Sequence, residues 1–417
     1  MTAVGTQPGP ATTRVGWGFV ALYALSYTGG SLVFLAPLLV SLALKVNDLV
    51  GIDAAPGALA MVTGIGSLLA IVANPLFGRL SDRTTARIGM RRPWMVAGLV
   101  LGAAGTVTVA TAPNVAVVLV GWCTCQVFFN ATLAAQAAVL PDQVPAEQRG
   151  LVSGVLGLSV PVASVVGTFL VQAFRHSTLL MFVVPCVVGG AAVLLFAWRL
   201  PDRRLSPRDK PPWSGRELAG TFYVSPRHNP DFAWAFASRF LLVTAYAFLV
   251  TYQAYYLLAQ VGSAEADVPR QVYLGTVAQS AALVVVAPVA GRLSDRLGRR
   301  KVFVMGAAVV YAVALVVVAA SSSFDGYLLG MVVGGVGFGM YMAVDLALVV
   351  DVLTDPLTAA KDLGVLNIAG ALPFAVAPAL APALLALGGG SYAVLYAVAA
   401  ACALGGAAAV APIRSVA

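Results

Sequence analysis

The amino-acid sequence predicts an all-α integral membrane protein: twelve transmembrane helices in two parallel-repeat six-helix bundles, with both termini in the cytoplasm. Three observations predict this fold, namely an apolar composition, twelve long apolar runs and a repeated loop. Of the 417 residues, 60% are hydrophobic and only 10% are Asp, Glu, Lys or Arg, whereas an ordinary soluble domain has about 25% charged residues. This composition excludes a soluble enzyme, a nucleic-acid-binding protein and a disordered chain.

Each of the twelve apolar runs is long enough to cross a bilayer, which takes about 20 residues of helix. Backbone groups in lipid must bond to one another, and none of the runs alternates like a strand, so helices are expected. The runs cover residues 15–44, 55–79, 93–112, 115–140, 149–173, 178–199, 232–260, 268–291, 301–321, 324–353, 362–387 and 391–411. The polar segment 201–231 predicts a cytoplasmic linker between bundles at 1–200 and 232–417.

The distribution of basic residues predicts the orientation in the membrane. With both termini in the cytoplasm, 21 of the 25 Lys and Arg residues lie in cytoplasmic segments and 3 in extracellular ones. This asymmetry is typical of multi-pass proteins, whose cytoplasmic loops are basic. We therefore expect a plasma-membrane protein whose basic cytoplasmic face contacts anionic lipids.

The cysteines and histidines form no pattern typical of a metal site or of a disulfide framework. Cys123, Cys125, Cys186 and Cys402 all lie in apolar runs, and the two histidines lie far apart in sequence. An intramembrane enzyme would need clustered catalytic groups within the spans, and the spans hold one well-buried acid and no histidine. We expect no metal, no cofactor and no enzymatic activity.

A repeated loop predicts an internal duplication. Gly78–Arg83 recurs letter for letter as Gly291–Arg296, an offset of 213, and the same offset carries Val139–Asp142 onto Val352–Asp355 with one substitution. A shared offset in separate loops indicates duplication of a six-helix unit in the same orientation. Transporters built from such repeats bind their substrate between the halves, near the middle of the membrane.

The repeated Gly-x-Leu-x-Asp-Arg sequence, followed by Gly and a basic cluster, resembles the signature loop of the major facilitator superfamily. With the twelve predicted spans, the resemblance to the superfamily covers nearly the whole chain. In the first copy four extra residues precede Gly89, and the loop ends in Arg91-Arg92-Pro93. That longer loop is similar to the sucrose/proton and the glycoside–pentoside–hexuronide:cation symporters. The resemblance implies alternating access by a secondary transporter, here expected to be a monomer that binds a small solute and a proton or other cation.

The resemblance also implies that the two loops gate the cytoplasmic side, although their contacts could serve only to stabilise the loops. Gly78 and Gly291 would let a neighbouring helix approach closely. Asp82 and Asp295 would accept hydrogen bonds where another helix begins. The basic residues expected to hold these carboxylates or to lie near headgroups are Arg83, Arg91, Arg92, Arg296 and Arg299.

In the superfamily, helices one, four, seven and ten surround the cavity, and candidate polar residues on helices one and four can be read from their spacing. Tyr23 and Tyr27 share one face of helix one, and Gln126 and Asn130 share one face of helix four. The tyrosines could bind a sugar ring or could simply pack. Where the sucrose symporters have an aspartate linked to proton coupling this chain has Gln126, and where they have a substrate-binding arginine it has Ala137.

Helices seven and ten carry the buried charges. Arg239, Tyr246 and Gln253 follow at seven-residue steps and so share a stripe, while Asp345 is the one carboxylate well inside a span. Charges in hydrocarbon are costly unless paired or wet. We expect Arg239 and Asp345 to pair across the cavity, with Asp345 coupling transport to a proton or cation. The alternatives are a snorkelling Arg239 and a static ion pair.

Two transport functions fit these residues. The long first loop favours cation-coupled uptake of a sugar or glycoside. The neutral helix four instead suits proton-driven efflux of small amphipathic compounds.

The topology can be tested with a reporter fused to either terminus. Because basic residues gather on one side, we expect the reporter to stay cytoplasmic. Labelling of a tag at Ala417 from outside the cell would contradict twelve spans.

Overall fold

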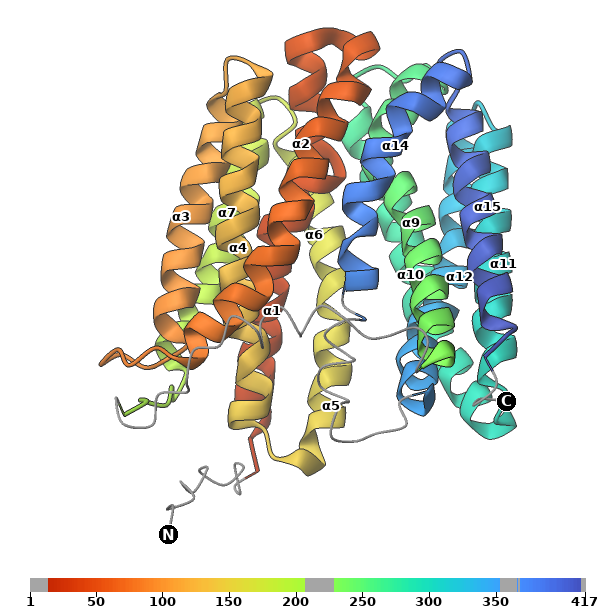
Figure 1. Cartoon of the computed structure of the whole chain (residues 1–417). Coiled ribbons are helices and arrows are strands. Elements are labelled where there is room, and N and C mark those ends of the chain that lie inside the picture. The colour runs from red at the N-terminus through yellow and green to blue at the C-terminus, as the bar shows by residue number, and fades with distance from the viewer. Residues whose placement is uncertain (1–13, 207–228, 353–365, 367, 414–417) are drawn as a thin grey trace.

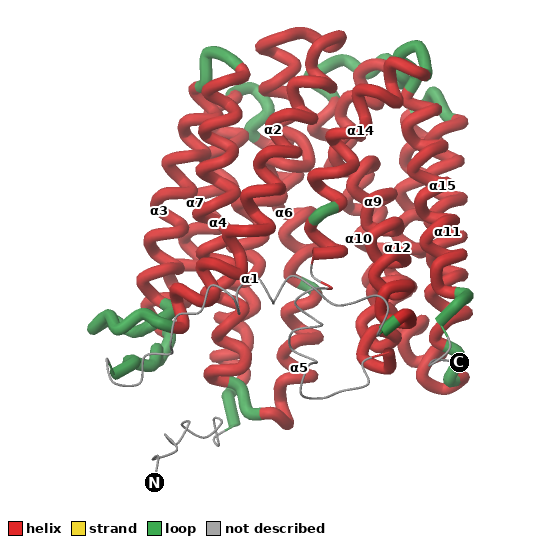
Figure 2. The backbone as a smooth tube through the Cα atoms, in the orientation of Figure 1, coloured by secondary structure: helices red, strands yellow, loops and turns green. Residues whose placement is uncertain are grey.

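The computed structural model describes residues 14–206, 229–352, 366 and 368–413. Within them every regular element is a helix (Figure 2). Most of the expected linker, the repeat residue Asp355, the start of the eleventh span and both chain ends lie outside the described residues. The domain limits at residues 200 and 232 therefore stay a prediction.

The amino-terminal half contains six membrane crossings. Its helices are α1 (Trp17–Ala36), the π-helix η1 (Pro37–Ser41), α2 (Leu42–Asp82), α3 (Arg92–Thr111), α4 (Val115–Gln143), α5 (Ala146–Gly157), α6 (Ser159–Ala173) and α7 (Thr178–Arg199). The fifth expected span is thus broken at Leu158 into α5 and α6. The first two spans form one helical stretch that reverses at Gly51, whose φ of 74° and ψ of 163° suit glycine alone.

The carboxyl-terminal half repeats this arrangement (Figure 1). Its helices are α9 (Pro230–Ala259), α10 (Val268–Leu297), α11 (Arg300–Ala320), α12 (Phe324–Val352), α14 (Pro373–Leu387) and α15 (Tyr392–Val410). The described residues hold eleven helical stretches long and apolar enough to span a membrane. The first of them, Trp17–Asp82, has 66 residues and reverses at Gly51, so it accounts for two crossings. The chain is a multi-pass membrane protein.

The two halves run in the same direction, as a parallel repeat requires. The carboxyl ends of the first crossing and of α9 lie at one end of the molecule, where the Tyr255 hydroxyl donates to the Ala43 carbonyl at 2.9 Å. At the opposite end lie the starts of α1 and α9 and the end of α15 (Figure 1).

The halves are sealed together at the end that carries Gly51. Tyr255 also reaches the Ala55 carbonyl at 3.5 Å, and the Tyr252 hydroxyl donates to the Pro56 carbonyl at 3.3 Å. Phe169 of α6 packs against Tyr273 of α10 with ring centroids 5.7 Å apart. The described conformation is thus closed at this end, which is the extracellular end in the predicted orientation.

Within the amino-terminal half, α1 and α7 cross in close contact because both carry glycine at the crossing. A Cβ atom built on Gly29 would lie 2.4 Å from the Gly189 carbonyl oxygen, and one built on Gly189 would lie 2.5 Å from that of Gly29. Transmembrane helices commonly use small residues for such approaches.

Replacing Gly189 should therefore destabilise the protein. In Gly189→Val the new side chain forces α1 and α7 apart, and overpacking of this kind costs about 1–3 kcal/mol. Gly154→Val is the matched control, because no atom lies within 4 Å of a Cβ there. Thermal unfolding of the purified proteins should show a lower midpoint for Gly189→Val only; equal midpoints would contradict the close crossing.

Candidate functional site

A cavity of about 650 Å³ lies between the two halves. Its wall includes α1, η1, α4, α5 and α6 from one half and α9, α10 and α12 from the other. It thus involves the fifth and eighth crossings as well as the four that the superfamily resemblance implies. The expected residues on its wall are Tyr23, Tyr27, Arg239, Tyr246 and Gln253.

Tyr23 and Tyr27 line the cavity from α1. The buried Tyr23 hydroxyl donates to the Gln136 carbonyl of α4 at 2.7 Å, and the two tyrosine rings meet edge to face at 6.3 Å. The Gln136 side chain returns to α1, where its Nε2 donates to the Ser26 carbonyl at 2.8 Å. These bonds hold Tyr23 in place and leave Tyr27 as the tyrosine whose hydroxyl has no described partner.

Gln126 and Asn130 do not line the cavity. Gln126 is buried against Gly66 of α2, and Asn130 accepts a hydrogen bond from Asn74 of α2 at 3.2 Å. Ala137, seven residues beyond Asn130, does line the cavity. Asn130 and Ala137 lie on the same face of α4, two turns apart. Helix α2 covers this face at Asn130, whereas at Ala137 it faces the cavity.

Arg239 and Asp345 form the ion pair that their positions in the sequence predict. Arg239 Nη1 lies 2.8 Å from Asp345 Oδ2, and the Asp345 side chain is only 7% exposed. Arg239 lines the cavity, whereas Asp345 lies behind it on α12. Of the two charged residues, it is therefore Arg239 that a molecule in the cavity could contact, and the role of Asp345 in coupling stays a prediction.

Tyr246 and Gln253, which share one face of α9 with Arg239, also line the cavity, beside a pair of stacked aromatic rings. Tyr246 stacks on Phe338 of α12 with centroids 4.4 Å apart and planes at 9°. The Gln253 Oε1 accepts a hydrogen bond from the Tyr327 hydroxyl at 2.8 Å. Both residues of the stack reach the cavity wall.

Sequence reasoning missed the polar residues that α10 supplies to the wall. Thr276, Gln279 and Ser280 line the cavity from this helix. The available signal was a glutamine and a serine side by side inside the apolar run 268–291. The superfamily resemblance does not place helix eight among the cavity helices, so it gives these residues no role.

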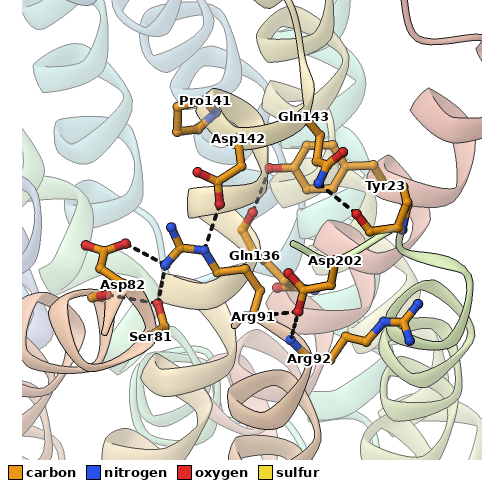
Figure 3. Close-up of polar contacts among 12 residues, drawn as sticks. Tyr23, Ser81, Asp82, Arg91, Arg92, Gln136, Pro141, Asp142, Gln143 and Asp202 are labelled. Carbon is orange, nitrogen blue, oxygen red and sulfur yellow. Dashed lines mark hydrogen bonds and ion pairs between the residues drawn. The ribbon is translucent and has the colours of Figure 1, made fainter. Parts of the chain in front are cut away.

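The polar contacts of the first repeated loop centre on Arg91 (Figure 3). Its guanidinium lies between two carboxylates, with Nη1 2.6 Å from Asp82 Oδ1 and Nε 2.8 Å from Asp142 Oδ2 at the end of α4. Burial alone would lower the pKa of Arg91, but the hydrogen bond and charge of Asp142 and those of Asp82 outweigh it and raise the pKa. Arg91 therefore stays charged although its side chain is only 5% exposed.

Asp202, just after α7, holds the same loop from the other side (Figure 3). Its Oδ2 accepts from the backbone N–H groups of Arg91 and Arg92 at 2.7 and 2.8 Å, which caps the start of α3. Gly89 has a φ of 115°, and any side chain there would collide with Asp202. The Arg92 side chain donates to the Leu200 carbonyl. Neither Asp142 nor Asp202 was among the expected gating residues.

The described ion pair of the second loop is longer and more exposed than those of the first. Asp295 is 70% exposed, and its ion pair is with Arg300 at 3.8 Å; Arg300, rather than the expected Arg299, takes the place of Arg91. Arg296 and Arg299 are exposed and Arg83 is half-buried.

The two loop glycines do not bring another helix into close contact in this conformation. No described atom lies within 4 Å of a Cβ at Gly78, and the nearest to one at Gly291 is the Ala343 Cβ at 3.7 Å. Asp355, the repeat partner of Asp142, lies outside the described residues. Nor do the described residues bring together three or more His, Cys, Asp or Glu side chains as a metal site would require.

Comparison with known proteins identifies relatives by family and by fold. The family model described as Major Facilitator Superfamily matches residues 19–268 and 267–415. No curated protein matches the sequence.

Three solved structures share the fold at low identity. The nucleoside transporter NupG is 13% identical, with a TM-score of 0.74 over 95% of this chain and 99% of its own. The human organic anion transporter MFSD10 (TETRAN) is 16% identical, with a TM-score of 0.67 over 94% and 98%. A bacterial homolog of the human lysosomal transporter Spinster, inward-facing and unoccupied, is 14% identical, with a TM-score of 0.62 over 95% and 93%.

Removing the Arg91 side chain should destabilise the folded protein. In Arg91→Met, Asp82 and Asp142 lose their shared cation, and hydrogen bonds to charged groups contribute about 1.5–3 kcal/mol each. Because a raised arginine pKa adds stability that is lost only above the ordinary arginine range, the loss should be equal at about pH 6 and about pH 8.

Arg87→Met is the matched control, since Arg87 is an exposed arginine of the same loop with no described partner. Thermal unfolding should show a lower midpoint for Arg91→Met than for Arg87→Met. Equal midpoints would mean that the contacts of Arg91 do not stabilise the folded protein.

Proposed function

The chain belongs to the major facilitator superfamily and is a transporter, and on that premise we propose that it moves a small polar solute by alternating access, coupled to a proton or other cation. A sugar or glycoside is the favoured solute. The observation that carries the proposal is the ion pair of Arg239 and Asp345 at the wall of the central cavity.

The shape of the molecule supports alternating access. The cavity lies between the halves, and the tyrosine hydrogen bonds close it at one end. Breaking those bonds, together with closure of the end where the Asp82 and Asp295 loops lie, would expose the cavity at the end that carries Gly51. Rocking of repeated bundles about a central site is the usual mode of such transporters.

The ion pair supports coupling to a cation. An ion pair this buried is costly to break unless a new partner replaces the lost one. A proton on Asp345, or a substrate oxygen on Arg239, would supply that replacement. Solute binding and protonation would then alter the same pair.

The cavity wall supports a small solute with a ring and hydroxyl groups. A volume of about 650 Å³ is in the usual range for small-molecule sites. The stacked Tyr246 and Phe338 offer an aromatic face, and Gln253, Thr276 and Ser280 offer hydrogen bonds. Sugars and glycosides combine apolar ring faces with hydroxyls.

Efflux of small amphipathic compounds by proton antiport is the second candidate. The amino-terminal wall favours it, because Leu39, Leu140, Leu156 and Val160 line the cavity there. In either case we propose a monomer in the plasma membrane, with anionic lipids at its basic cytoplasmic face.

Uptake into proteoliposomes tests the proposal. We expect accumulation of one or more sugars or glycosides from a panel when a pH gradient is imposed, and little without it. Indifference to every member of the panel, with gradient-driven export of an amphipathic dye, would favour the second candidate.

Variants of the ion pair extend the assay. Asp345→Asn should lose the dependence on the gradient, whereas Asp325→Asn, at an exposed acid in the first turn of the same helix, should keep it. Reversing both charges (Arg239→Asp with Asp345→Arg) should restore part of the uptake that either reversal alone abolishes. Normal gradient dependence in Asp345→Asn would refute the coupling role.

A further inference from the structure

The Tyr341 side chain is fully buried beside the central ion pair, and its hydroxyl makes no hydrogen bond of ordinary geometry to any described residue. Tyr341 lies on α12 four residues before Asp345, so the two side chains share one face of the helix. The hydroxyl is near enough to interact with the Asp345 carboxylate. A polar group that can bond to Asp345 is therefore in place, and the bond is not made in this conformation.

Other buried tyrosines of this half do reach an acceptor. Tyr327, on the same helix, donates to Gln253 Oε1 at 2.8 Å, and Tyr256 of α9 donates to the Ser321 carbonyl at 2.9 Å. A buried hydroxyl that makes no hydrogen bond is destabilising. A conformation in which the Tyr341 hydroxyl completes a hydrogen bond would therefore gain stability, and the Asp345 carboxylate is the charged acceptor beside it.

The two members of the ion pair differ in what can reach them. Arg239 lines the cavity and its side chain is 19% exposed, whereas Asp345 lies behind it and is 7% exposed. A Cβ on Gly370 would lie 3.8 Å from Arg239 Nε and Nη2, so a glycine adjoins this side of the guanidinium. A solute that bonds to Arg239 would weaken the ion pair and leave Asp345 buried. Among the described residues, the charged or titratable groups that face Asp345 are Arg239 and Tyr341.

We propose that Tyr341 is the alternative partner of Asp345, to which this carboxyl group bonds when Arg239 binds the solute. The Tyr341 hydroxyl donates to the ionised carboxylate, and its oxygen accepts from the carboxyl O–H once Asp345 has taken up a proton. Tyr341 keeps its own proton in both cases, so it is a positioning residue that acts through Asp345. The proposal rests on the proposed function, in which Arg239 meets the solute and Asp345 takes up the coupled proton.

A cycle of variants tests the hydrogen bond without a transport assay. Arg239→Gln removes the cation, so Asp345 should bond to Tyr341 instead. Tyr341→Phe should then lower the thermal unfolding midpoint of the Arg239→Gln protein and change that of the wild type little. Tyr396→Phe is the matched control, because Tyr396 is also fully buried with an unpartnered hydroxyl, and its electrostatic neighbours are other tyrosines. An equal effect of Tyr341→Phe in both backgrounds would overturn the proposal.

The pH dependence of uptake tests the role in transport, and it decides the matter if Arg239→Gln does not fold. The probes are glucose and methyl glucoside, taken up into proteoliposomes at a series of external pH values. A hydroxyl stabilises an ionised carboxylate more than a protonated one, so without it Asp345 takes up a proton at a higher pH. In Tyr341→Phe the midpoint of the pH dependence should therefore rise by about one unit, whereas Tyr396→Phe should match the wild type.

The outcomes separate this role from the proposed function. If the wild type shows gradient-driven uptake and Tyr341→Phe has the same pH midpoint, the proposal is wrong and the transport function stands. Loss of uptake in Tyr341→Phe together with a lower unfolding midpoint in the otherwise wild-type protein would indicate that Tyr341 serves packing, which also contradicts the proposal. If the wild type accumulates neither probe at any pH, the proposed function fails, and the role of Tyr341 in transport fails with it.

Discussion

The cost of an unmet polar group or an unpaired charge in hydrocarbon determines the organisation of this molecule. It requires the backbone to be helical wherever it crosses the membrane. It also requires the charges inside the spans to meet, as Arg239 and Asp345 do at 2.8 Å. Several of the polar side chains that remain line the cavity, among them Gln253, Thr276 and Ser280, and there water or a solute can reach them.

The two copies of the repeated loop have diverged within this shared plan. The first is fixed on several sides, with Arg91 between Asp82 and Asp142 and with Asp202 on the start of α3. The described residues of the second include a longer ion pair at an exposed carboxylate. The longer first loop includes Gly89, whose positive φ lets the backbone turn in close contact with the Asp202 side chain.

A residue's position was predictable from sequence when its own chemistry and its place in a span determined its surroundings. It was not predictable when those surroundings depended on which other helices pack beside it. The spans were predictable because bilayer thickness sets their length. The Arg239–Asp345 pair was predictable because two opposite charges buried at similar depth avoid the cost of an unpaired charge by pairing. The location of Asn130 was not predictable, since spacing gives the angle of a side chain on α4 but not whether α2 covers it. Asp142 and Asp202 are ordinary loop acids in sequence, and only the meeting of α3, α4 and α7 makes them partners of Arg91.

The seal near Gly51 has a consequence for how the protein responds to its surroundings. Its buried bonds join tyrosine hydroxyls to the backbone carbonyls of Ala43, Ala55 and Pro56, so no formal charge takes part in them. Dissolved ions screen charges and leave such neutral dipoles nearly untouched. Salt concentration should therefore have little effect on the hydrogen bonds that close this end, and more effect on the partly exposed ion pairs of Arg91 and Asp295 at the other end.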